Sequence, residues 1–404
     1  MAQNKESRVL FVSESVTLAH FARPFELSNQ LSNNDFDIHF ACDLTYQKFL
    51  HDSKHTTHTI HSISPSKFKQ SLNKGSPLYD YATLKSYVED DLDLIHTIKP
   101  DLIVGDFRIS LAVSARLAKI PYATISNAYW SPYAPRHYPA PCLPLTRYLG
   151  LAAGSFLFKL AAPLAFKVHA LAMRRLHDHF GLPKFPLDLR RVYTEADYTL
   201  YADIPSLFPL DKLPENHFFI GPILWSPPIP EPNWWHSLPT DRPIIYVSMG
   251  SSGSERALET ILNTFAKEKV TVIATVAGSA FSNTNLSNIF TAEYLDGNAA
   301  AKRADLVICN GGSLTCQQAF FNGKPVLGIA SNMDQFLNMA GVSRVNAGLM
   351  LRSDDLSETK LLNSYQTIMK KTAIAHNLDA LKIEVVHQLD QHKFVTFVSS
   401  LLTN

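Results

Sequence analysis

The stretch that decides the fold reads ADLVICNGGSLTCQQ and occupies residues 304–318. Its first part, residues 305–309, is a continuous apolar run, which is typical of a strand buried on both faces. Asn310, Gly311 and Gly312 then turn the chain into a helix that ends near residue 323. Unpaired N–H groups at a helix start suit a phosphate, and glycine lets the phosphate come close. The stretch predicts a strand–turn–helix unit, and on its own an ordinary tight turn explains it equally well.

The same alternation runs through both halves of the chain. Further helices are expected within residues 25–34, 111–118 and 257–265, and strands joined by helices predict an α/β fold with parallel sheets. Short apolar runs predict the other strands at residues 8–13, 38–41, 101–106, 244–248, 270–276 and 325–329.

A proline-rich segment divides the chain. Residues 222–243 contain seven prolines, which remove backbone donors and disfavour regular structure. A chain of 404 residues is most simply two domains. We therefore expect one domain on each side of this segment.

The composition excludes several classes of protein. Hydrophobic residues make up 46% and charged residues 18%, which is enough apolar material for two cores and too little charge for disorder. The net charge of +1 argues against nucleic-acid binding and against a polybasic membrane surface. Four scattered cysteines do not make a disulfide scaffold. The polar start of the chain lacks a signal-peptide pattern, and the apolar run from 148 to 158 ends at Lys159, so we expect a cytoplasmic protein.

A second Gly/Ser turn lies in the C-terminal half, at residues 247–253, and two such turns favour a diphosphate ligand. A dinucleotide-binding dehydrogenase is the obvious competitor. Its G-x-G-x-x-G fingerprint should follow the first strand, but residues 14–22 contain no glycine. The P-loop motif is also absent from the sequence.

Three blocks carry a family resemblance. Residues 18–24, LAHFARP, resemble a first-loop G-H-x-x-P block with Ala19 at the position of the glycine. Residues 100–106 resemble the strand that ends in the second catalytic residue, and residues 310–335 resemble the donor signature. The chain thus resembles the nucleotide-sugar-dependent glycosyltransferases of the GT-B fold, which include UDP-glycosyltransferases and bacterial macrolide-type enzymes.

This resemblance implies two facing Rossmann-like domains with parallel sheets and a cleft between them. Residues 1–221 would form the acceptor-binding domain, and 222–243 the linker. Residues 244–384 would bind the nucleotide sugar, and a C-terminal helix, 385–404, would return to the N-terminal domain.

The resemblance also implies two catalytic residues, His20 and Asp106. An acceptor hydroxyl needs a base before it can attack an anomeric carbon, and an imidazole titrates near neutral pH. Asp106 would orient the His20 ring and stabilise the imidazolium. The carboxyl ends of parallel strands share one edge of a sheet, so we expect the two side chains to meet. Without the resemblance, a lone His in a loop is most simply a solvated side chain.

The donor site implied by the resemblance lies in the C-terminal half. Two of its positions depart from the family pattern, because Asn310 stands where relatives have His, and Gln318 where they have Glu. The implied contacts are Ser251, Asn310, Gly311, Gly312 and Ser313 for the diphosphate, Gln318 for the ribose, Asp334 and Gln335 for the sugar, and Tyr294 and Leu295 for the base.

The function implied is that of an inverting, metal-independent glycosyltransferase without a cofactor. It would move a hexose from a nucleotide sugar, UDP-glucose or a similar UDP-sugar, to a hydroxyl of an apolar small molecule or lipid. A sugar-nucleotide epimerase on the same fold and a catalytically weak sugar-nucleotide-binding protein remain as alternatives.

Two other features are weighed against simpler explanations. The histidines at positions 51, 55, 58 and 61 could bind a metal if they shared a helix, but the threonines between them disfavour helix. The apolar segment 149–166 could make a peripheral membrane contact. A buried or acceptor-lining helix is the interpretation that we favour there, because Lys159 and Pro163 interrupt the segment.

Overall fold

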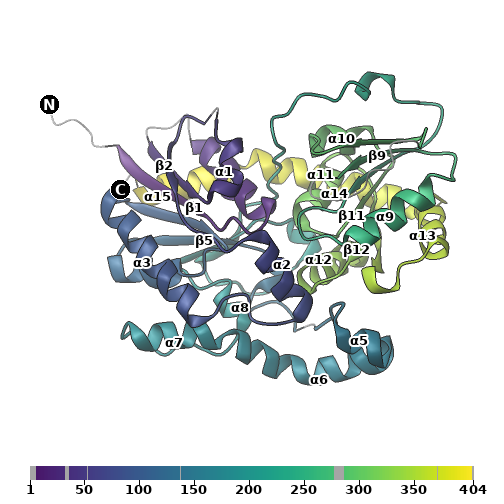
Figure 1. Ribbon diagram of the computed structural model, residues 1–404. Coiled ribbons are helices and arrows are strands. Elements are labelled where there is room, and N and C mark those ends of the chain that lie inside the picture. The colour runs from purple at the N-terminus through teal and green to yellow at the C-terminus, as the bar shows by residue number, and fades with distance from the viewer. Residues whose placement is uncertain are drawn as a thin grey trace. The chain divides into compact units, whose positions relative to one another are not determined.

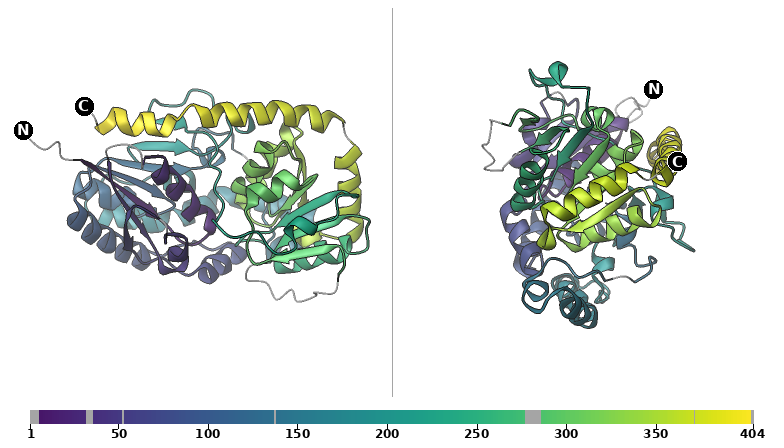
Figure 2. Two further views of the ribbon diagram at one scale, coloured as in Figure 1. Left: turned by 90° about the horizontal axis from the view of Figure 1, so that it is seen from above. Right: turned by 90° about the vertical axis from the view of Figure 1, so that its right-hand side faces the viewer.

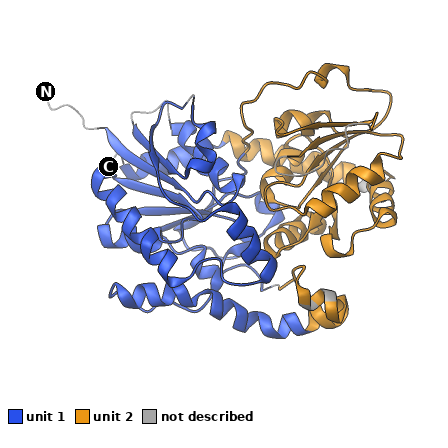
Figure 3. Cartoon of the chain, in the orientation of Figure 1, with its two compact units in different colours: residues 1–136, 157–223, 391–404 blue, residues 137–156, 224–390 orange. Residues whose placement is uncertain are grey.

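The computed structural model describes residues 6–31, 36–51, 53–136, 138–276, 286–370 and 372–402. The chain divides into two compact units (Figure 3). Unit 1 comprises residues 1–136, 157–223 and 391–404, and unit 2 comprises residues 137–156 and 224–390. Each unit is built on one parallel sheet.

The sheet of unit 1 has the strand order β3-β2-β1-β4-β5-β6-β7 (Figure 1). Its central strands are buried because their sequences are continuously apolar. The order reverses between β1 and β4, and ligands of open α/β sheets bind outside the carboxyl ends of the strands at such a point. The strands are β1 (Ser7–Ser13), β2 (Phe36–Cys42), β3 (Thr56–Thr59), β4 (Leu102–Asp106), β5 (Tyr122–Ser126), β6 (Tyr198–Tyr201) and β7 (His217–Phe219).

Helices cover both faces of this sheet, because successive crossovers leave β1 in opposite directions. The expectation of a loop at residues 18–24 is wrong, since α1 begins at Leu18 and His20 lies in its first turn. The described helices of unit 1 include α1 (Leu18–Leu31), α2 (Pro65–Lys74), α3 (Tyr81–Ile98), α4 (Leu111–Ala118), α7 (Leu171–His179), α8 (Leu189–Val192) and α15 (Lys393–Leu402), with 3₁₀ turns at Leu44–Phe49, Ala128–Trp130 and Pro205–Leu207.

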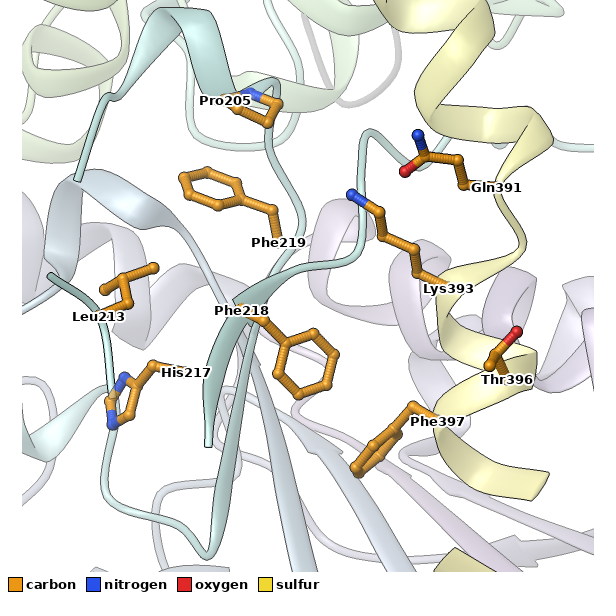
Figure 4. A pocket seen from close by; sticks show the side chains of 9 residues that line it. All are labelled: Pro205, Leu213, His217, Phe218, Phe219, Gln391, Lys393, Thr396 and Phe397. Atoms are coloured by element: carbon orange, nitrogen blue, oxygen red, sulfur yellow. The ribbon is translucent and has the colours of Figure 1, made fainter. Parts of the chain in front are cut away.

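The last residues of the chain complete the core of unit 1. Phe394 of α15 is buried, and its ring centroid lies 6.1 Å from that of Phe11 in β1. Figure 2 (left) shows α15, at the yellow end of the chain, beside the strands and α1. Phe397 packs on Phe218, at 5.3 Å, and both line a groove of about 710 Å³ (Figure 4).

The expectation of one continuous final helix is wrong. The helix α14 (Thr372–Asp390) ends before His392, which has a positive φ of 44°. A new helix, α15, begins at the next residue. A left-handed residue cannot continue an α-helix, so the chain breaks at this point.

Unit 2 has the strand order β10-β9-β8-β11-β12-β13, which reverses between β8 and β11. Ser248 pairs with Cys309, so both Gly/Ser turns leave the sheet at the same level of one edge. The strands are β8 (Ile244–Ser248), β9 (Thr271–Thr275), β10 (Ile289–Ala292), β11 (Leu306–Cys309), β12 (Val326–Ala330) and β13 (Gly348–Arg352). The other described helices are α5 (Pro144–Leu149), α9 (Glu255–Phe265), α10 (Gly297–Arg303), α11 (Ser313–Phe321), α12 (Met333–Arg344) and α13 (Glu358–Lys370), with 3₁₀ turns at Trp235–Ser237 and Ser353–Asp355.

A segment from the first half of the chain packs on unit 2. Arg352, at the end of β13, donates to the carbonyl oxygens of Ala140, at 2.7 Å, and Pro141, at 3.2 Å. The Cys142 N–H donates to the Ser331 carbonyl oxygen at 2.8 Å. These bonds group residues 137–156 with unit 2, and α6 (Leu151–His169) leads the chain back to unit 1.

Candidate active site

The structure brings His20 and Asp106 together in unit 1. β1 and β4 pair in parallel with Ser13 opposite Asp106, so the chain enters α1 beside the end of β4. His20 Nδ1 lies 2.8 Å from Asp106 Oδ1. A carboxylate only accepts, so we assign the hydrogen to Nδ1, which leaves the Nε2 lone pair free to take a proton. The His20 side chain is 17% exposed and that of Asp106 is fully buried, so the imidazole is accessible while its partner is not.

Arg23 is part of this site, and the sequence analysis missed it. Its Nε donates to Asp106 Oδ2 and its Nη2 to Asp106 Oδ1, both at 2.7 Å. Its Nη1 donates to Asn127 Oδ1 at 2.8 Å. Burial acts to lower the pKa of Arg23, but the Asp106 carboxylate outweighs it and the pKa is raised. Arg23 therefore stays charged and fixes both carboxylate oxygens; its position three residues after His20, one helical turn on, is the signal that could have found it.

Phe107 fixes the other side of the His20 ring. The two rings stack with centroids 4.3 Å apart and an interplanar angle of 12°. Phe107 has a φ of +59°, which is rare for a bulky residue and marks a site where the surrounding structure imposes the backbone conformation. Tyr193 packs on the Phe107 ring at 5.2 Å. The imidazole is thus held by a hydrogen bond at Nδ1 and by stacking on its face.

A buried charge network holds the loops that carry these residues. Arg108, fully buried, donates to Glu14 at 3.1 Å and to Asp91 at 3.0 Å. Tyr87 also donates to Glu14, at 2.9 Å. Burial raises the pKa of Glu14, and the Arg108 charge opposes that shift. The Glu14 N–H donates to the Asp106 carbonyl oxygen at 3.1 Å, so the network ties the loop after β1 to the end of β4.

In unit 2, the two Gly/Ser turns are hydrogen-bonded to one another. Asn310 Nδ2 donates to Ser252 Oγ at 3.1 Å, and Gln335 Nε2 donates to the same oxygen at 3.2 Å. The Gly312 N–H donates to Asn310 Oδ1 at 2.9 Å. Ser251, the serine chosen from the sequence, is exposed, whereas its neighbour Ser252 makes these bonds. Sequence alone does not show which of two adjacent serines turns inward.

The start of α11 is open to an anion. Gly312 is its N-cap and has no side chain that could accept from the first-turn N–H groups, which include that of Ser313. Gly311 has a φ of +83°, and a Cβ there would lie 2.7 Å from Met339 Cγ. Both the conformation and the close approach require glycine.

The residues expected to contact the sugar begin α12. Asp334 lies in its first turn and is partly buried. The Gln335 side chain is buried, and its Oε1 accepts from the Ser331 N–H at 2.8 Å and closes a capping box with Asn332. Gln335 therefore shapes the loop before α12 as well as the Ser252 turn.

The residues expected at the nucleoside lie around α10 and α11. Gln318 Nε2 donates to the Trp225 carbonyl oxygen at 2.8 Å and to Ser226 Oγ at 3.1 Å. Tyr294 and Leu295 immediately precede the Asp296 N-cap of α10, and Leu295 is buried. Gln318 thus joins α11 to the chain just before β8 and faces α10, since a Cβ on Gly297 would lie 2.6 Å from its Oε1.

Across the described ranges, no group of three or more His, Cys, Asp or Glu residues could hold a metal ion. The four clustered histidines do not share a helix. His58 lies in β3 and its Nε2 is 2.9 Å from His39 Nδ1, whereas His55 lies 3.0 Å from Ser28 Oγ. The β-branched threonines form a strand here, as their propensity favours.

Comparisons with known proteins agree with this geometry. Residues 244–391 match the glycosyltransferase family 28 C-terminal domain. The chain is 45% identical to a PGL/p-HBAD biosynthesis rhamnosyltransferase of Mycobacterium bovis, over 91% of this chain and 82% of that protein. It is 46% identical to a PGL/p-HBAD biosynthesis glycosyltransferase of Mycobacterium tuberculosis, over 87% and 82% of the two chains. A relative of M. bovis described as an inactive PGL/p-HBAD biosynthesis glycosyltransferase is 45% identical over 65% and 72%.

Solved structures show the same fold. The glycosyltransferase of kitacinnamycin superposes with a TM-score of 0.70 at 17% identity, covering 99% of this chain and all of that one. The spinosyn rhamnosyltransferase gives 0.69 at 18% identity, with 99% and 100% covered. The expected family and the expected fold of two parallel-sheet domains are therefore confirmed. The chain belongs to the glycosyltransferases of the GT-B fold.

Proposed function

We propose that this glycosyltransferase moves a deoxyhexose of the rhamnose type from a pyrimidine nucleoside diphosphate to a hydroxyl group of an apolar phenol or lipid. The 45% identity to a rhamnosyltransferase supports the sugar. A spinosyn rhamnosyltransferase of the same fold was solved with thymidine diphosphate, which supports a pyrimidine nucleotide. Both UDP and thymidine diphosphate belong to that class, and the experiment below separates them.

The His20–Asp106–Arg23 arrangement carries the proposal. His20 Nε2 takes the proton of the acceptor hydroxyl while the oxygen attacks the anomeric carbon. The bond from that carbon to the diphosphate breaks, and the diphosphate leaves with the electron pair. A single displacement of this kind inverts the anomeric configuration. Asp106 stabilises the imidazolium, and Arg23 keeps the carboxylate ionised and in place.

The leaving diphosphate is assigned to unit 2. N–H groups at the start of α11 and the Ser252 turn offer hydrogen bonds and the positive end of a helix dipole to its charge. Asn310 is neutral, and so it adds a hydrogen bond without adding charge. In this proposal a metal ion is not required, so EDTA should leave turnover unchanged; a rate that collapses with EDTA and returns with Mg²⁺ would refute metal independence.

The test is a transfer assay with purified protein, a long-chain alkylphenol as the acceptor, and three donors: thymidine diphosphate rhamnose, UDP-rhamnose and UDP-glucose. We expect product with a rhamnosyl donor, and a loss in kcat of about 10²–10⁴-fold in His20→Ala with donor affinity unchanged. The matched control is His51→Ala, at an exposed loop position, which should keep full activity.

A second candidate function is donor binding without transfer, which the inactive relative at 45% identity favours. It predicts that calorimetry detects a nucleotide, that no acceptor or donor gives product, and that His20→Ala is indistinguishable from the parent. Product formation that depends on His20 would exclude it.

A further inference from the structure

The helices α6 (Leu151–His169) and α7 (Leu171–His179) carry an apolar surface that the described structure leaves open. Together, Leu151–His179 are long and apolar enough to cross a membrane by length and composition, with a mean hydropathy of 1.5 in their most apolar window. Only 17% of that window is buried. The interpretation of this segment as a buried helix is therefore wrong.

The exposed residues form one row, which we call the apolar stripe. Its members recur every three or four residues, so they share one face of the helix pair. They are Leu157, Leu160, Leu164, Val168 and Leu171, exposed by 42%, 65%, 66%, 41% and 40%. Figure 3 shows α6 and α7 at the lower border of unit 1, with no other element of that unit beyond them.

The opposite face of the same helices packs on unit 1. Ala162, Phe166, Ala170 and Met173 are buried, and the Phe166 ring lies 6.4 Å from that of Trp130. A surface helix of a water-soluble protein normally places polar residues opposite its buried face. Here both faces are apolar, and a contiguous exposed apolar patch marks an interaction surface.

The charge around the stripe indicates what it binds. The sequence has no Asp or Glu between Asp106 and Asp178, although the whole chain has a net charge of only +1. Lys159, Lys167 and Arg175 are exposed on the same helices. An apolar row flanked by cations on one helix is typical of a helix that lies in the interface of an anionic membrane.

Two other occupants fit less well. A second copy of this chain, docked through the same patch, would place the cations of one copy against those of the other, with no acidic residue in the segment to pair with them. A membrane span would require the helix to leave its packed face and to bury Lys159 and Lys167 in lipid.

We propose that the apolar stripe docks this protein on an anionic membrane surface, with α6 and α7 lying in the plane of the membrane. The leucines enter the boundary between headgroups and acyl chains, and the lysines contact the headgroups. This inference stands on the helix pair alone and does not depend on the sugar donor or on the acceptor.

The test is flotation of the full chain with vesicles of phosphatidylcholine, and of phosphatidylcholine with a third of phosphatidylglycerol. We expect the parent to float with the anionic vesicles, and the double variant Leu160→Glu/Leu164→Glu to bind at least about tenfold more weakly. The matched control is Leu44→Glu/Ile383→Glu, which adds the same charge at side chains exposed by 67% and 71% outside the stripe. It should float almost as the parent does.

Lysine variants test the charge separately. Lys159→Gln/Lys167→Gln should lower binding to anionic vesicles several-fold, by about 1 kcal/mol for each charge near the surface. Every variant changes an exposed side chain, so the melting temperature of each should match that of the parent, which distinguishes lost docking from lost folding.

Three results would overturn the proposal. The parent could fail to float with either vesicle, or the stripe and control variants could weaken binding equally. Sedimentation could also show a dimer that Leu160→Glu/Leu164→Glu dissociates, while the parent ignores vesicles; the stripe would then be an interface between two copies.

Discussion

Arg23 and Asp106 form a buried ion pair, joined by two contacts of 2.7 Å. Removing one partner leaves the other charge buried without its partner, which costs about 3–5 kcal/mol. We therefore expect Arg23→Met to lower the free energy of unfolding by about that amount, as measured by urea denaturation. The double variant Arg23→Met/Asp106→Asn should be more stable than Arg23→Met, because a neutral Asn leaves no buried charge. If the losses of the two single variants simply add, the coupling that we infer does not exist.

His217 makes the stability of unit 1 depend on pH. Burial and the charge of Arg191 lower the pKa of His217 from 6.5 to about 4. Between these values the unfolded chain binds a proton that the folded chain excludes, so stability is lost as the pH falls from about 6.5 toward 4. His217→Gln can still donate to the Tyr201 oxygen, which His217 Nδ1 approaches at 2.9 Å, and does not titrate. We expect a smaller decrease in melting temperature between pH 7 and pH 5 in this variant; an identical decrease would show that other groups carry the effect.

At the scale of single residues, the sequence predicts identity better than direction. The family resemblance pointed to His20 and Asp106, and the structure places them in contact. Arg23 stood in the same block and was missed, because an arginine in a sequence is most simply a solvated side chain. Ser252 was missed because the rotation of a turn decides which of two serines faces Asn310. Such choices depend on packing from segments far away in the sequence.

At the scale of elements, the helix α11 has a left-handed glycine at each end. Gly311 has a φ of 83° and Gly323 a φ of 65°. A Cβ at Gly323 would meet Lys382 Cδ at an ordinary 3.5 Å, whereas one at Gly311 would lie 2.7 Å from Met339 Cγ. We expect Gly323→Ala to cost about 1–2 kcal/mol, which is the strain of the left-handed backbone.

Gly311→Ala should cost at least about 1 kcal/mol more, because the packed Met339 must also move. It should in addition weaken the binding of UDP or thymidine diphosphate, measured by calorimetry, since the turn shapes the start of α11. Equal nucleotide affinity in both alanine variants would remove this turn from the donor site.

The elements themselves were predictable to different degrees. The strand expected at residues 244–248 is confirmed, because a buried parallel strand reads as a continuous apolar run. The start of α1 was not predictable, since no N-cap residue immediately precedes Leu18 and Pro24 lies inside the helix. The break at His392 was missed because no Gly or Pro marks it. Local chemistry signals strands well and unusual helix ends poorly.

At the scale of the whole molecule, unit 1 depends on α15. Phe394 is 2% exposed and packs toward Phe11, so Phe394→Ala should cost about 3–5 kcal/mol. The loss should be confined to unit 1. Native-state hydrogen exchange should show faster exchange of amides in β1 and unchanged exchange in β8. Ser400→Ala, on the same helix, serves as the control, and a uniform loss of protection in both sheets would contradict a separate unit 1.

The distribution of unit 1 along the chain also bears on how the protein is made. Domains generally fold during synthesis in the order in which they leave the ribosome. Residues 1–223 emerge first, but the hydrophobic side of β1 that Phe394 covers must wait for residues 391–404. Unit 2, whose last residue is 390, has all of its sequence available before unit 1 does. The nascent N-terminal half is thus exposed to aggregation until translation ends, and a ribosome that stalls within the last fourteen residues leaves it unfinished.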